Sequence, residues 1–210
     1  MNKVQQLIVL AGLAAFVTSI TLFTSENDAF AIQFSNYTSE KYGIQFEYPS
    51  DWELTEKISR FDSGADIDIT SNGTTSISML YGDDGLEYGY GSADIETATL
   101  KFYNDLIDLA FGYEFKSIEK PSFITIDGQK TGTFLFTMEE KYKDVSPKLA
   151  LQQWITFVGD IGYSFTFTAL TGSFDKPENM EIRDHFIKSL KFLGDKIPTT
   201  TTSNSTSRFD

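Results

Sequence analysis

Apolar residues alternate with polar residues or glycine at the start of the patterned part of the chain. Every second residue from Tyr42 to Tyr48 is aromatic or aliphatic, which is typical of a strand with one buried face. Pro49 has no backbone N–H and is expected to end this strand. A turn at 50–51 then leads to Trp52, which opens a second strand pointing inward.

The same period-two pattern recurs along the rest of the chain. It predicts further strands at 65–70, 75–81, 114–118, 123–126, 133–138, 149–158 and 163–169. Turn residues separate several of them, at Ser71-Asn72-Gly73, Asp127-Gly128 and Gly159-Asp160.

Two segments have helical spacing instead. Apolar residues recur at three- and four-residue steps over 95–111, and Gly112 is expected to end that helix. A second helix is predicted to begin after Asp175, with Pro177 in its first turn. Its buried row is Ile182, Phe186 and Leu190.

Strands grouped between helices predict an α+β fold with an antiparallel sheet, in the order ββββ-α-ββββ-α. One face, rich in Phe and Tyr, needs helical cover. The other face carries many Thr, Ser and Gln residues but also Leu80, Leu135 and Ile155. We expect a short helix or a long loop to cover that second face only in part.

The first 31 residues have the pattern of an export signal. Lys3 precedes an uncharged apolar run over 7–23, and Ala29-Phe30-Ala31 has the small-x-small pattern of a cleavage site. The run is short for a permanent span, which needs about 20 apolar residues. We expect a signal peptide at 1–31, with a retained signal anchor as the alternative. Both place the domain, residues 32–195, in a secreted or extracytoplasmic location.

Residues 196–210 are rich in Ser and Thr and almost devoid of apolar side chains, so we expect a disordered tail. Asn36, Asn72 and Asn204 each stand in an N-x-S/T sequence, the acceptor pattern for N-glycosylation in an exported protein.

The charge is strongly acidic, −13 for the whole chain. Without residues 1–31 the chain keeps 16 basic and 28 acidic side chains, a net charge of −12. This surface repels phosphate backbones and anionic headgroups, which argues against nucleic-acid and peripheral membrane binding. Cysteine is absent, so thiol catalysis and thiolate metal sites are excluded.

Enzyme motifs are weak. His185 is the one histidine, and no G-x-S-x-G turn accompanies it. Ser117 and Lys120 fit S-x-x-K, and Lys130-Thr131-Gly132 fits K-T-G, two signatures of penicillin-recognising enzymes. The serine of those enzymes starts a helix, whereas Ser117 is predicted in a strand, so we interpret the match as coincidental.

Carboxylates are the plentiful reactive groups. They gather in two runs, Asp62, Asp66 and Asp68 in the first, and Asp83, Asp84 and Glu87 in the second. The second run is our candidate calcium site, although neither run follows the D-x-D-x-D-G loop pattern and a solvated acidic loop explains both. A hydrolase using two carboxylates is a lesser alternative, because it needs a cleft that sequence does not reveal. Otherwise we expect no cofactor.

The loop around 81–94 is the best candidate for binding a partner. Tyr81, Tyr88 and Tyr90 alternate there with four glycines, a mixture of rigid aromatic anchors and adaptable backbone that is typical of binding loops. The alternative is that these tyrosines fold back onto the core.

The element Tyr48-Pro49-x-x-Trp52, within "KYGIQFEYPSDW", resembles the opening of the PsbP family. The resemblance extends to about Phe192 and includes a central helix and a closing helix that ends in "IKSLKF". It implies an antiparallel sheet sandwiched by helices, with Tyr48, Pro49 and Trp52 in structural roles. The best-known family member is an extrinsic protein of photosystem II, and its docking depends on basic residues and a long N-terminal extension. This chain differs in both respects and looks like the exported prokaryotic members of unknown role. We therefore expect a monomeric, non-enzymatic domain that binds a protein partner at the cell envelope.

Overall fold

The computed structural model describes residues 31–58, 64–71, 73, 75–82, 94–108, 113–140 and 147–194. Residues 1–30 of the predicted signal peptide and the whole predicted tail lie outside these residues. The described part has helices α2 (Ile95–Asp108) and α3 (Pro177–Ser189), and none of its helices is long and apolar enough to cross a membrane. Its strands are β1 (Phe34–Ser39), β2 (Ile44–Pro49), β3 (Glu53–Ile58), β4 (Gly64–Thr70), β5 (Ser76–Gly82), β6 (Tyr113–Ile126), β7 (Gln129–Glu140), β8 (Leu149–Val158), β9 (Ile161–Leu170) and β10 (Lys191–Phe192).

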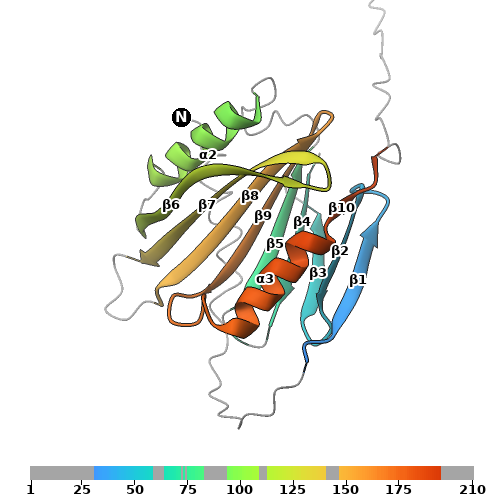
Figure 1. Ribbon diagram of the computed structural model, residues 1–210, viewed down its shortest axis with the longest axis horizontal. Helices are drawn as coiled ribbons and strands as arrows, with labels where there is room; N and C mark the ends of the chain where they lie inside the picture. Colours follow the sequence, from blue (N-terminus) through green and yellow to red (C-terminus); the bar gives the residue numbers. More distant parts are fainter. Residues whose placement is uncertain are drawn as a thin grey trace, which may run out of the picture.

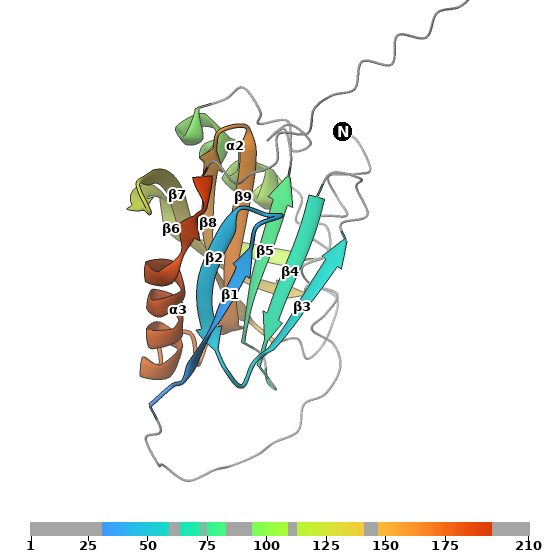
Figure 2. The ribbon, with the colours of Figure 1, turned by 90° about the vertical axis from the view of Figure 1, so that its right-hand side faces the viewer.

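The strands form two antiparallel sheets. One has three strands in the order β1-β2-β10, and the other has seven in the order β3-β4-β5-β9-β8-β7-β6 (Figure 1). The predicted α+β class with antiparallel pairing is confirmed. The separate three-stranded sheet was not predicted, and Figure 2 shows β1 and β2 lying against the larger sheet.

The first face of the seven-stranded sheet holds the main core. Phe165 of β9 is fully buried, and its backbone neighbours are Met79 of β5 and Trp154 of β8. Phe186 of α3 packs edge-on against both Phe165 and Phe46 of β2, with ring centroids 5.8 and 5.2 Å apart. The aromatic face is therefore covered by a helix, as expected, and also by β2.

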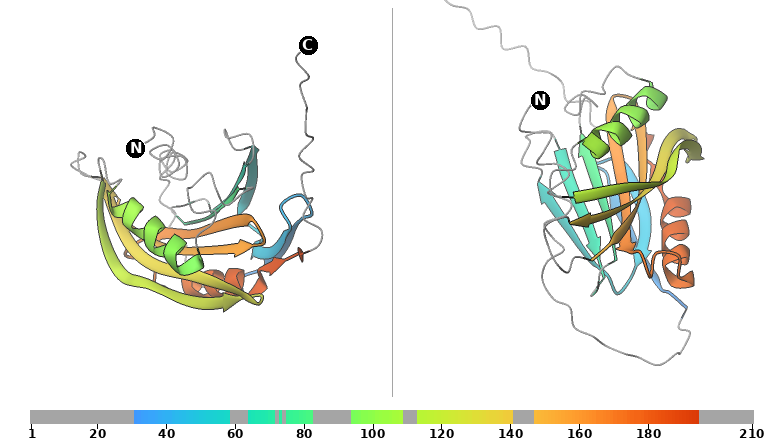
Figure 3. Two further views of the ribbon diagram at one scale, coloured as in Figure 1. Left: turned by 90° about the horizontal axis from the view of Figure 1, so that it is seen from above. Right: turned by 90° about the vertical axis from the view of Figure 1, so that its left-hand side faces the viewer.

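Helix α2 covers one part of the second face. Phe134, Phe136 and Met138 of β7 point to this side and pack around Leu106 of α2. Figure 3 shows α2 on the inside of the curved sheet and α3 on its other side. Leu135 was assigned to this face, but it alternates with these residues and packs against the core of the first face, so that assignment is wrong.

The predicted strands differ from the structure at β1, β6 and β10. The segments 114–118 and 123–126 belong to one strand, β6, which continues through Pro121 with register shifts between Ser117 and Ser122. A proline is tolerated there because β6 is an edge strand. β1 and the two-residue β10 were not predicted at all.

Candidate functional site

Tyr81 lies in strand β5 and not in the loop that follows. Its side chain is 8% exposed, and its ring contacts those of Tyr163 and Tyr42 at centroid distances of 5.6 and 5.3 Å. This placement corrects the expectation that Tyr81 offers a partner-binding surface. Its ring packs in the core between the two sheets and so holds the start of the loop in place.

The other residues proposed for this loop lie outside the described part of the chain. They are Tyr88 and Tyr90 for a partner, and Asp83, Asp84 and Glu87 for calcium. The structure describes the residues at both ends of the loop, Gly82 at the end of β5 and Asp94 before α2.

Three connections leave the seven-stranded sheet from the same end. Gly82 is the Cα partner of Gly64 in β4 and of Gly162 in β9. The segments 59–63 and 83–93 and the turn at 159–160 therefore begin at neighbouring positions on paired strands. Since adjacent strands lie about 4.8 Å apart, Gly64 and Gly82, the described residues that flank the connections 59–63 and 83–93, lie close together.

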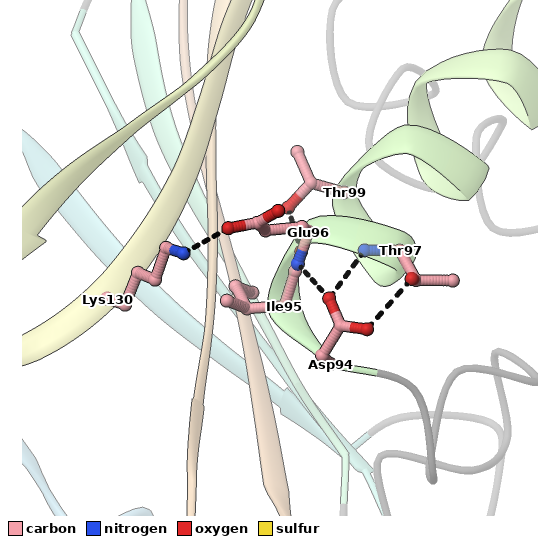
Figure 4. Close-up of polar contacts among 6 residues, drawn as sticks. All are labelled: Asp94, Ile95, Glu96, Thr97, Thr99 and Lys130. Carbon is pink, nitrogen blue, oxygen red and sulfur yellow. Dashed lines mark hydrogen bonds and ion pairs between the residues drawn. The ribbon is translucent and has the colours of Figure 1, made fainter.

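Asp94 caps the N-terminus of α2 and fixes the far end of the loop. Its Oδ1 accepts hydrogen bonds from the Glu96 and Thr97 N–H groups, each at 3.0 Å, and its Oδ2 accepts one from the Thr97 hydroxyl at 2.9 Å (Figure 4). The Thr97 groups, with the Glu96 N–H, hold the pKa of Asp94 below its ordinary value. The carboxylate thus satisfies N–H groups that the first helical turn leaves free.

The start of α2 is also fixed to β7 by the residues of the K-T-G match. A Cβ on Gly132 would stand 2.0 Å from the Thr99 hydroxyl oxygen, so only glycine allows α2 this close. Lys130 forms an ion pair with Glu96 (Figure 4). Lys130 and Gly132 therefore position the helix.

Ser117 does not approach these residues. It lies in β6 opposite Phe136, whereas Lys130 lies opposite Thr125. Lys130 and Phe136 are six positions apart along β7, which is about 20 Å in a strand. The S-x-x-K and K-T-G matches thus do not form one site.

The chain passes from the three-stranded to the seven-stranded sheet between β2 and β3. Tyr48, Pro49 and Trp52 lie at this connection. Pro49 is buried at the end of β2, and the Trp52 N–H donates to the Pro49 carbonyl at 3.0 Å, which closes the turn. Tyr48 and Trp52 are half-buried against the core of the first face. All three residues pack or turn the chain in this structure.

His185 joins α3 to the three-stranded sheet. Its ring stacks on Phe34 of β1 at a centroid distance of 3.6 Å, and its Nε2 lies 2.5 Å from a Glu47 carboxylate oxygen. Ser189, one turn further, accepts a hydrogen bond from the Glu47 N–H at 2.9 Å. Sequence reasoning missed this contact because Glu47 and His185 are 138 residues apart.

The half of the second face away from α2 is polar. One row of polar side chains crosses five adjacent strands from β3 to β8. It consists of Thr55, Asp68, Ser78, Thr166 and Gln153. The Lys57 Nζ lies 2.6 Å from the Asp68 Oδ2, so this carboxylate of the first acidic run already forms an ion pair. Thr166 donates to the Gln153 side-chain oxygen at 2.8 Å.

This polar half shows no cluster of metal ligands among the described residues. No buried side-chain polar atom there lacks a hydrogen-bond partner, and no three potential metal ligands converge in that part of the chain.

Comparisons with known proteins identify the fold and no closer relationship. No protein-family model matches the sequence, and no curated protein matches it. Among solved structures, cyanobacterial PsbP (CyanoP) from Synechocystis sp. PCC 6803 is similar, with a TM-score of 0.55 and 13% identity over 80% of this chain and 98% of that one. The Saccharomyces cerevisiae Ran-binding protein Mog1p is similar with a TM-score of 0.52 and 9% identity, covering 78% of this chain and 97% of that one. The chain therefore has a PsbP-like fold.

Proposed function

We propose that the chain is an exported, non-enzymatic PsbP-like domain that binds a protein partner at the cell envelope through the loop 83–93. The observation that carries this proposal is the firm attachment of both ends of the loop. A long tyrosine- and glycine-rich connection mounted on fixed ends combines adaptable contacts with a rigid base, which suits recognition.

The two attachments are of different kinds. On one side Tyr81 is buried between Tyr42 and Tyr163. On the other side Asp94 caps α2, while Gly132 lets the helix seat closely on β7. Neither end can shift without disturbing the core, so binding energy at the loop is not spent on ordering its base.

The structural similarities support a binding role. Mog1p, which shares the fold, is described as a Ran-binding protein, so this architecture serves protein binding in at least one other chain. Its partner is not transferred to this chain, because a shared fold does not determine function.

A photocrosslinking amino acid placed at position 88 or 90 tests the assignment in the native membrane fraction. The proposal predicts a crosslinked product from the loop positions and none from position 107, an exposed site on α2. A product from position 107 alone would place the contact on the helix instead and contradict the proposal.

Calcium binding is the second candidate, and the strand register favours it. Because Gly64 and Gly82 are paired, the connection that carries Asp83, Asp84 and Glu87 begins beside the end of the connection that carries Asp62. Hard oxygen ligands drawn from two loops suit Ca²⁺. This candidate is compatible with partner binding, since the ion would order the same loop.

A carboxylate hydrolase has less support. A general acid of that kind needs a raised pKa. Hydrogen bonds from the Thr97 N–H and hydroxyl and from the Glu96 N–H lower the pKa of Asp94. Partial burial pushes the pKa of Asp127 upward, but the Phe192 N–H and Lys191 outweigh it, so this pKa is lowered as well. The Asp94 carboxylate caps α2, and the Asp127 carboxylate accepts from the Phe192 N–H and from Lys191.

A further inference from the structure

We propose that Asn36 carries an N-linked oligosaccharide in the native protein and that this glycan covers the free edge of β1. The proposal rests on the export proposed above and adds a modification site on β1, a strand that the partner-binding proposal does not use.

The sequence Asn36-Tyr37-Thr38 lies on an edge strand. β1 is the outermost strand of the three-stranded sheet, and only β2 pairs with it among the described residues. The sheet therefore presents one row of backbone N–H and C=O groups without a partner strand, which is a template for unwanted pairing.

The acceptor residues point outward while the residue between them holds the strand in place. Asn36 and Thr38 are two residues apart in a strand, so they share a face, and both are exposed. Tyr37 is 9% exposed, stacks on Phe46 at a centroid distance of 4.8 Å and donates to Glu56 at 3.0 Å. Burial, and also the Glu56 carboxylate, raises the pKa of Tyr37, so its hydroxyl stays protonated and keeps this bond.

The two side chains required for modification are not engaged elsewhere. Within the described residues, neither the Asn36 carboxamide nor the Thr38 hydroxyl forms a hydrogen bond, whereas the neighbouring Ser35 hydroxyl donates to Ser50 at 2.8 Å. The folded domain thus exposes the complete N-x-T acceptor. Asn72 and Asn204, in the other two acceptor sequences, lie outside the described residues.

The chemistry requires a lipid-linked oligosaccharide and a membrane transferase as co-reactants. The Asn36 amide nitrogen forms a bond to the anomeric carbon of the sugar, and the bond from that carbon to the lipid phosphate oxygen breaks. The amide loses one proton to a base on the transferase, and the lipid phosphate leaves with the electron pair of the broken bond. No oxidant or reductant takes part.

Mass spectrometry of the protein purified from its own organism tests the proposal. Trypsin cleaves after Lys41, and after removal of the signal peptide it releases residues 32–41, which contain Asn36 as their one acceptor sequence. We expect this peptide mainly with the added mass of whole sugar units. An unmodified peptide that begins at Ile32 overturns the glycan but leaves export intact.

Matched variants expressed in the same organism separate the acceptor from other effects. Asn36→Gln and Thr38→Ala should both lose the added mass, whereas Thr38→Ser should retain it because it keeps the hydroxyl. Retention of the mass in Asn36→Gln would contradict the assignment. If the glycan covers the edge, Asn36→Gln should also self-associate at lower concentration than Thr38→Ser.

Discussion

The Tyr163 hydroxyl donates a 2.7 Å hydrogen bond to the backbone carbonyl of Tyr42. Tyr163 lies in β9, at the centre of the seven-stranded sheet, and Tyr42 lies in the turn between β1 and β2. Both residues are buried, at 1% and 3% exposure. This hydrogen bond joins the two sheets. It lies close to the start of the loop that we assign to partner binding, because the Tyr163 ring contacts Tyr81.

Tyr163→Phe should therefore destabilise the domain while preserving its ring packing. The variant leaves the buried Tyr42 carbonyl without a donor, a loss of about 1–3 kcal/mol in the free energy of unfolding. Urea denaturation followed by tryptophan fluorescence measures it. Tyr113→Phe is the control, because the Tyr113 hydroxyl is not hydrogen-bonded within the described residues, and it should change stability by less than about 0.5 kcal/mol. Equal effects of the two substitutions would refute this role of Tyr163.

Gly132→Ala should push α2 away from β7. Its methyl group would stand 2.0 Å from the Thr99 oxygen, and overpacking of this kind costs about 1–3 kcal/mol. Thr99→Ala removes two of the three close contacts and should restore part of the loss. Gly172→Ala has open space around its Cβ and should be neutral or stabilising, by at most about 1 kcal/mol. Thermal unfolding of Gly132→Ala, of Gly132→Ala combined with Thr99→Ala, and of Gly172→Ala gives the comparison. A neutral Gly132→Ala would show that α2 does not contact β7 as closely as described.

Asp127 should make stability depend on pH in the acid range. Partial burial pushes its pKa upward, but the Phe192 N–H at 2.8 Å and the Lys191 ammonium at 3.1 Å outweigh this effect, so the pKa is lowered. A lowered carboxyl pKa contributes stability that is complete above the unfolded value of about 3.9 and is lost as the pH falls through the folded value.

Asp127→Asn removes the carboxylate charge and keeps the backbone conformation, since asparagine tolerates the φ of 46° at this position. The stability difference between the two proteins should be constant near neutral pH and should shrink below about pH 4. Denaturation at a series of pH values measures it. A difference that grows on acidification would reverse the sign and contradict the assignment.

Calcium should raise the melting temperature if the connections at 59–63 and 83–93 share an ion. A ligand at 100-fold its dissociation constant adds about 2.7 kcal/mol, which corresponds to roughly 5–10 °C for a domain of this size. The variant Asp83→Asn/Asp84→Asn should lose the shift, and magnesium should replace calcium poorly. An unchanged melting temperature at millimolar calcium would remove this second candidate.

The strongly alternating parts of the fold were predictable from sequence. In β9 the residues Tyr163, Phe165 and Phe167 alternate with small polar residues, and the structure buries this row. The turn at Asp127-Gly128 was also predicted, and both residues adopt positive φ values, 46° and 81°. In these segments local pattern and tertiary packing agree.

The missed elements depend on partners far away in the chain. β1 has one deeply buried side chain, Tyr37, and is held by β2, while β10 is two residues long and is held by Asp127 and Gly43. Leu135 was assigned to the wrong face because both rows of β7 carry apolar residues, so its pattern does not reveal which row faces α2. The contact between Asp94 and α2 was local and detectable as a cap sequence, whereas the seating of Thr99 on Gly132 was not.

The affinity of the loop variants for the partner recovered by crosslinking tests the central claim most directly. Titration calorimetry compares the domain with Tyr88→Ala/Tyr90→Ala and with Leu100→Ala/Ile107→Ala, which alters two exposed apolar residues of α2. We predict that the loop variant raises the dissociation constant at least about 10-fold, as loss of aromatic anchors does at interfaces, and that the helix variant binds like the unmodified domain. Unchanged affinity of the loop variant, or loss of binding in the helix variant alone, would contradict the account.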